Sequence, residues 1–197
     1  MNHLFKETAR IHGDIFEFGC RWGQNSALFS ALRGIYEPFN RHKKIVSFDT
    51  FEGFPKLHSK DGKHNMMVKG ALSTVKDYDK YLYKILKLHE QLNPLNHIEK
   101  FEIVKGDTIK ELPKYLKRRP ETIIALAYFD FDIYEPTKKV LEIIKPRLVK
   151  GSIVAFDELN DRDAPGETLA LLETFGLNSI KLQKFPFASR VSYFIFE

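Results

Sequence analysis

The chain has 197 residues, of which 43% are hydrophobic, and this predicts one globular domain over residues 1–197 and excludes a wholly disordered chain. Its 31 Lys and Arg against 26 Asp and Glu give a net charge of +5, and the basic residues are scattered. A mild positive surplus suits a phosphorylated or nucleotide-bearing ligand, but it falls short of a nucleic-acid-binding signature. We therefore expect no nucleic-acid partner.

Cysteine content and hydropathy limit the cellular compartments in which we expect this protein. The single Cys20 excludes an internal disulfide and fits a reducing environment. No apolar run approaches the ~18 residues needed to span a bilayer. The polar stretch 1–12, a helical turn or loose arm, carries no signal-peptide core. These features predict a soluble, cytoplasmic protein without a membrane partner.

The first structural unit is a strand, a glycine turn and a helix. Residues 15–20 form a β-prone apolar run of the length of a central parallel strand. Gly19 and Gly23 let the backbone turn tightly and approach a ligand closely. A helix follows over residues 24–36, with free N–H groups at its start. Such a unit places a ligand at the carboxyl end of an open α/β sheet.

Glu17 is unusual because it lies inside this apolar strand. One interpretation places it at an edge or in a pair with a Lys or Arg. The other is a carboxylate facing a cationic or hydroxyl-rich ligand, since a buried charge needs a partner. A charged residue within a buried strand favours the second interpretation.

Strands and helices then alternate. We expect strands over residues 45–50, 98–105, 122–130 and 151–156, and helices over 72–92, 107–118, 136–145 and 167–175. Residues 56–70 have no periodic pattern and predict a lid or mobile loop. Residues 179–185 and 190–196 predict a closing antiparallel hairpin. The predicted fold is α/β: a Rossmann-like, seven-stranded, mostly parallel sheet with an antiparallel C-terminal strand and helices on both faces.

Acidic residues lie at or near the carboxyl ends of four predicted strands. They are Glu17, Asp49, Asp130, Asp132, Asp157 and Glu158. In a parallel sheet these ends converge on one crevice, where like charges repel unless something positive or hydroxyl-bearing is bound. Some of these acids could instead cap the following helices. The two pairs after the fourth and fifth strands suggest a divalent cation, and oxygen ligands suit magnesium, manganese or calcium.

Asp49 is placed differently, beside the glycine turn. An acid at the end of the second strand can hold a ribose diol. The G-x-G-x-x-G pattern is absent, so the turn that cradles a pyrophosphate is not made. S-adenosylmethionine has a ribose and no phosphate, and its sulfonium cation also gives the nearby acids a role. The predicted closing hairpin favours a methyltransferase, because seven-stranded sheets with an antiparallel last strand are typical of these enzymes.

Three segments carry a family resemblance: Gly13-Asp14-Ile15-Phe16-Glu17-Phe18-Gly19, Ser47-Phe48-Asp49-Thr50-Phe51-Glu52-Gly53-Phe54-Pro55 and Phe129-Asp130-Phe131-Asp132-Ile133-Tyr134-Glu135-Pro136-Thr137. Together they resemble the macrocin O-methyltransferase (TylF-like) family, which are metal-dependent class I S-adenosylmethionine methyltransferases. Asp157-Glu158-Leu159-Asn160 and Pro165-Gly166-Glu167-Thr168 look closest to members that 3-O-methylate nucleotide-linked deoxyhexoses. Phe131 stands where the family usually has glycine, and Glu158 where it usually has aspartate.

The resemblance implies roles for particular residues. The predicted cofactor-binding residues are Glu17, Gly19, Trp22, Gly23, Ser26, Asp49, Thr50 and Asp107, with Glu17, Gly19, Trp22 and Ser26 at the methionine end, Asp49 on the ribose and Asp107 near the adenine. The predicted Mg²⁺ ligands are Asp130, Asp157 and Glu158, and the predicted catalytic residues are Asp130 and Asp132. Trp22 could equally be a core residue, and Asp107 could simply cap a helix.

The predicted activity is therefore O-methylation of a sugar hydroxyl, on a nucleotide-linked deoxyhexose or a glycosylated natural product. The alcohol must lose a proton, and Asp132 or a loop histidine, His58 or His64, could accept it. Two alternatives remain open: methylation of a catechol-like phenol, and a non-catalytic nucleotide-binding module. A nicotinamide oxidoreductase is a further alternative. The partner is a small molecule, and self-association is left open.

Overall fold

The computed structural model describes residues 1–197. The strands are β1 (Asp14–Phe18), β2 (Ile45–Asp49), β3 (Phe101–Lys105), β4 (Ile124–Phe129), β5 (Leu148–Phe156), β6 (Gln183–Lys184) and β7 (Ser192–Ile195). The α-helices are α1 (Asn2–Thr8), α2 (Gln24–Tyr36), α3 (Tyr78–Gln91), α4 (Thr108–Arg118), α5 (Tyr134–Ile144) and α6 (Gly166–Thr174). None of the helices is long and apolar enough to cross a membrane.

All strands belong to one seven-stranded sheet with the order β3-β2-β1-β4-β5-β7-β6. The first five strands are parallel, and β7 pairs antiparallel with both β5 and β6. The order in which successive strands are added to the sheet reverses between β1 and β4, and an open α/β sheet forms a ligand crevice at such a point. This arrangement confirms the predicted fold class.

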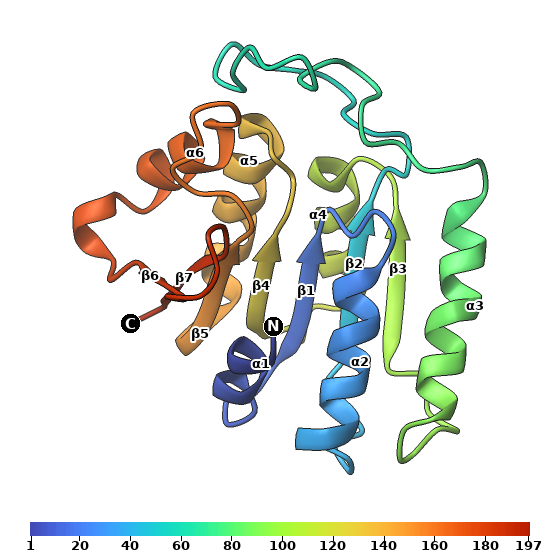
Figure 1. Cartoon of the computed structure of the whole chain (residues 1–197). Helices are drawn as coiled ribbons and strands as arrows, with labels where there is room; N and C mark the ends of the chain where they lie inside the picture. The colour runs from blue at the N-terminus through green and yellow to red at the C-terminus, as the bar shows by residue number, and fades with distance from the viewer.

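Alternation along the strands sends apolar side chains to two cores. Phe16 and Phe18 pack with residues of α4, α5 and α6 on one face, while Ile15 packs with residues of α1, α2 and α3 on the other. Figure 1 shows α1 and α2 in front of the sheet, α3 beside its β3 edge, and α4 and α5 behind it. Glu17 has the same parity as Ile15, so its side chain turns toward α2.

Two regions differ from the sequence-based expectation. The helix predicted from residue 72 begins at Tyr78, because Asp77 has a left-handed φ of 60° and the preceding residues cross over the sheet. There Thr74 donates from its N and its hydroxyl to the Phe51 carbonyl at 3.2 and 3.1 Å. The predicted C-terminal hairpin is present but short, and its second strand, β7, lies next to β5.

The other predicted elements are found with ends that differ by a few residues. The helix predicted around Pro113 is continuous as α4. The first residues form a regular helix, α1, whose Leu4 and Phe5 are fully buried, instead of a loose arm. The segment between β2 and α3 has no strand or regular helix, and Figure 1 shows it arching over the carboxyl ends of the parallel strands.

Candidate active site

A cavity of about 620 Å³ lies at the carboxyl ends of the parallel strands. Its walls come from the turns after β1, β2, β3, β4 and β5 and from the segment that arches over them. The acids among its lining residues are Asp49, Asp107, Asp130, Asp132, Asp157, Glu158, Asp161 and Asp163. The predicted convergence of acidic strand ends is thus observed.

Glu17 lies beneath this cavity and does not line it. Its side chain is 1% exposed and accepts a hydrogen bond from the Ser26 hydroxyl, which itself lies 2.6 Å from the Ser47 hydroxyl. No Lys or Arg pairs with Glu17, so the edge or ion-pair interpretation is wrong. Burial raises its pKa to about 7, against hydrogen bonds from Ser26 and Asn25 that lower it. Glu17 therefore ties the start of α2 to β1 and β2.

The glycine turn after β1 brings the backbone close to its neighbours. Gly19 has a φ of 91°, and a Cβ there would collide with the carbonyl oxygen of Asp130. Gly23, with a φ of 72°, is the N-cap of α2. Asp49 fixes the same turn, because its carboxylate accepts from the Arg21 N at 2.7 Å and the Phe51 N at 2.6 Å. Asp49 also lines the cavity.

The turn after β4 presents the two predicted catalytic acids. Asp132 has a left-handed φ of 62°, which is uncommon for a residue with a side chain. Burial and the neighbouring acid Asp157 raise the pKa of Asp130 to about 8. Burial and Glu158 raise the pKa of Asp132 to about 6. Carboxylates with pKa values near neutrality are suited to accept a proton.

Glu167, at the start of α6, supports this turn from behind. Its side chain is fully buried, and one carboxyl oxygen accepts from the Phe131 N at 2.9 Å. Its other oxygen is buried without a partner. Burial, and after it the charge of Asp132, raises the pKa of Glu167 well above its usual value. Neighbouring Gly166 leaves no room for a Cβ against the Tyr134 N.

This arrangement predicts a difference between two variants of Glu167. Glu167→Ala leaves the half-buried Phe131 N–H without an acceptor, which we expect to cost about 1–3 kcal/mol in the free energy of unfolding. Glu167→Gln keeps an acceptor oxygen, so it should lose less stability and retain more activity. Urea unfolding and kcat measured on both variants check this. Equal losses in both would contradict the role of the hydrogen bond.

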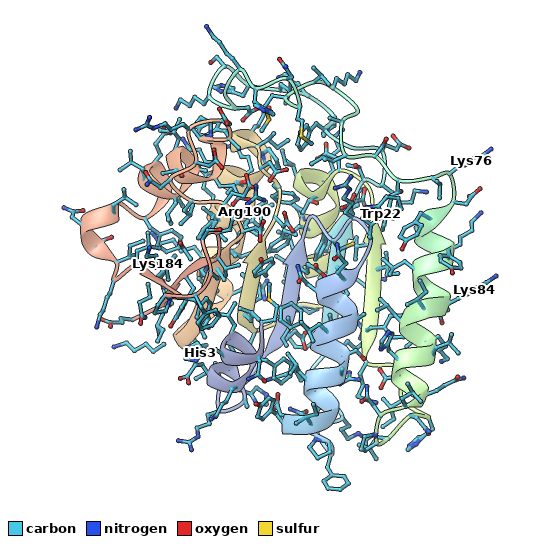
Figure 2. All side chains as sticks on the ribbon, in the orientation of Figure 1. His3, Trp22, Lys76, Lys84, Lys184 and Arg190 are labelled. Atoms are coloured by element: carbon cyan, nitrogen blue, oxygen red, sulfur yellow. The ribbon has the colours of Figure 1, made fainter.

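The acids after β5 are paired with protein groups. Asp157 accepts from the Tyr128 hydroxyl at 2.8 Å and lies 3.7 Å from an Arg190 guanidinium nitrogen. The same guanidinium forms an ion pair with Glu158. Figure 2 places Arg190 near the upper ends of the central strands, on the side of β5.

These pairings bear on the predicted metal ion. Carboxylate oxygens are the right donors for Mg²⁺. However, no three His, Cys, Asp or Glu side chains are arranged so that they could hold a metal ion. Asp130, Asp157 and Glu158 are therefore not gathered into a metal-binding group, and Arg190 contacts two of these three acids, Asp157 and Glu158.

The segment over the cavity is fixed near its middle. Asp61 is 1% exposed, and its carboxylate accepts from the His58 N and the Tyr134 N, both at 2.6 Å. Lys60 adds an ion pair with Glu173 of α6. Farther on, Met66 and Met67 line the cavity.

The predicted site residues fall into two groups. Those that line the cavity are Gly19, Asp49, Thr50, Asp107, Asp130, Asp132, Asp157 and Glu158. Those that lie outside its lining are Glu17, Trp22, Gly23 and Ser26. Trp22 packs edge-on against Tyr78 with ring centroids 4.8 Å apart. Asp107 also caps α4, since its carboxylate accepts from the Ile109 N at 3.1 Å.

Sequence reasoning did not select several residues of the lining. Arg21 stands within the glycine turn, and its buried Nε has no hydrogen-bond partner. Its place between Gly19 and Gly23 could have marked it as a ligand-facing cation. Arg190 follows a turn far along the chain, and no local pattern links it to the acids after β5.

The chain was compared with known proteins. No protein-family model and no curated protein matches it. A crystal structure of CalS11, described as a calicheamicin methyltransferase, is 42% identical, covers 98% of this chain and 76% of its own, and has a TM-score of 0.96. An apo structure of CalS11, described as a TDP-rhamnose 3'-O-methyltransferase, is 39% identical with the same coverage and a TM-score of 0.85. The O-methyltransferase NovP, at 16% identity, 98% and 79% coverage and a TM-score of 0.71, shares the fold.

Proposed function

Since the chain belongs to the macrocin O-methyltransferase (TylF-like) family of class I S-adenosylmethionine-dependent methyltransferases, we propose that it methylates a hydroxyl group of a sugar. The proposed acceptor is a nucleotide-linked deoxyhexose, as described for CalS11. The observation that carries the proposal is the convergence of Asp49, Asp130 and Asp132 on one cavity large enough for a small-molecule ligand.

In the proposed reaction the acceptor oxygen attacks the methyl carbon of S-adenosylmethionine in line with the sulfur. The new O–CH₃ bond forms as the S–CH₃ bond breaks, S-adenosylhomocysteine leaves, and the hydroxyl proton passes to a carboxylate. Asp132 is our choice for that carboxylate, because its pKa of about 6 leaves it ionised at neutral pH. Asp130, with a pKa of about 8, is the second proposed catalytic acid.

The cofactor roles follow from the position of each residue. Asp49 ends β2 beside the glycine turn, which supports its proposed role on the ribose. Gly19, Thr50 and Asp107 line the same cavity. Glu17 and Ser26 would act from below, by holding the start of α2. The sulfonium cation of the cofactor would offset part of the negative charge of the cavity.

The magnesium ion remains a prediction. The carboxylates do not form a ligand set, so we assign no step of the reaction to a cation. Arg190, which pairs with Glu158, would have to move before a metal ion could reach that acid.

The test is a methyl-transfer assay that follows the acceptor mass by mass spectrometry. We expect turnover with S-adenosylmethionine and a nucleotide-linked deoxyhexose, and little or none with a catechol. Running each acceptor with magnesium and with EDTA tests the predicted metal separately. Turnover with catechol alone would overturn the sugar proposal. Binding of S-adenosylhomocysteine without turnover on either acceptor class would favour a non-catalytic module.

A further inference from the structure

A second cavity, of about 410 Å³, lies at the opposite end of the sheet. It is bounded by the residues before β1, the segment between α2 and β2, the end of α4 and the residues before β4. In Figure 1 these elements meet below the sheet, away from the arching segment. The five residues of β1, a length of about 17 Å, separate the two ends.

The walls of this second cavity are mainly basic. Its Lys and Arg residues are Arg41, Lys43, Lys44 and Arg119, its histidines are His12 and His42, and its acids are Asp14 and Glu121. The cofactor cavity has the opposite balance, with eight acids against Arg21 and Arg190. The scattered basic residues of the sequence are thus partly gathered here.

Two of the four Lys and Arg side chains of this cavity, Arg41 and Lys44, form no hydrogen bond or ion pair within the protein. Arg119 reaches Glu121 only at 3.9 Å. Lys43 differs, because its Nζ is buried between Glu37 and the Thr8 carbonyl at 2.7 and 3.0 Å. The free charges therefore remain available to a ligand.

The backbone around the cavity is held without using those side chains. The Asn40 side-chain oxygen accepts from the His42 N at 3.0 Å and the Lys43 N at 3.1 Å. The Asp14 carboxylate accepts from the Lys44 N at 2.8 Å. Side-chain substitutions at Arg41 and Lys44 should thus leave the frame intact.

We propose that this cavity binds a small anion with two or more phosphate groups. Arg41 and Lys44, the two unpaired cations of this cavity, can each contact a phosphate oxygen, and such charge-assisted hydrogen bonds are stronger than neutral ones. Only two hydrophobic residues line the cavity, which disfavours an apolar ligand. Inorganic pyrophosphate and a nucleoside diphosphate share the required chemistry.

The test is calorimetric titration of the full chain, saturated with S-adenosylhomocysteine, with inorganic pyrophosphate. The double variant Arg41→Ala/Lys44→Ala should bind about tenfold more weakly or worse, a loss expected when two charged contacts are removed. The matched control is Lys76→Ala/Lys84→Ala, which removes the same charge from exposed side chains at and before α3 (Figure 2). The control should bind like the wild type.

A parallel titration with a nucleoside diphosphate separates the two sources of phosphate. Tighter binding than pyrophosphate would assign the cavity to nucleotides, and equal binding would assign it to the phosphates alone. The proposal is overturned if the wild type saturated with S-adenosylhomocysteine binds neither ligand, or if the control loses as much affinity as the Arg41 and Lys44 variant.

Discussion

Replacing Asp132 with Asn is expected to lower kcat by about 10²–10⁴-fold, the contribution of a positioned general base. The amide cannot accept the proton that the sugar hydroxyl must lose. Affinity for S-adenosylhomocysteine should stay close to the wild-type value, because binding of this product requires no proton transfer to Asp132. The measurements are single-turnover methyl transfer and calorimetric binding of S-adenosylhomocysteine.

Asp163→Asn is the matched control for this experiment. Asp163 lines the same cavity and is exposed, so its replacement removes one negative charge without touching the turn after β4. We expect the control to change kcat only slightly. If both variants lose kcat equally, the effect is one of overall charge, and the proton-accepting role of Asp132 is wrong.

The second large effect is the pH dependence of the stability of the cofactor-free protein. The acids with raised pKa values are Glu17 at about 7, Asp14 and Asp132 at about 6, and Asp130 at about 8. In the unfolded chain such groups titrate near pH 4. Between pH 5 and pH 8 the native state thus holds more protons than the unfolded state, so stability falls as pH rises.

One pKa unit corresponds to about 1.4 kcal/mol, so we expect the free energy of unfolding to fall by several kcal/mol across this range. Urea unfolding at pH 5, 6.5 and 8 measures the decline. Saturating S-adenosylmethionine should reduce it, because the sulfonium cation favours ionised acids. Asp130→Asn should also flatten the curve. A protein that becomes more stable from pH 5 to pH 8 would contradict the raised pKa values.

The convergence of acids could be predicted because it depends only on topology. Once the strands are assigned as parallel, their carboxyl ends must share one edge, and Asp49, Asp130 and Asp157 follow three of them. The position of Glu17 under the cavity follows in the same way from its parity with Ile15. These inferences use the period of a strand and the order of the chain.

The partners of these acids could not be predicted because they come from distant segments. Glu167 accepts a hydrogen bond from Phe131, 36 positions earlier in the sequence. Arg190 pairs with Glu158, and the whole of α6 lies between them in the sequence. The predicted start of α3 at residue 72 is also wrong, since Thr74 is held against Phe51 and the helix begins at Tyr78. In each case a tertiary contact outweighs the local pattern.

The hydrogen bond from the Tyr134 N to Asp61 anchors the segment above the cofactor cavity and so separates it into two parts. The part before it stays docked on α5, while the part beyond is bounded by Gly62 and Gly70, both with left-handed φ values. If this segment opens to release spent cofactor, we expect the opening on the side of Met66 and Met67, which line the cavity. The part before Asp61 would remain over the start of α5 throughout turnover.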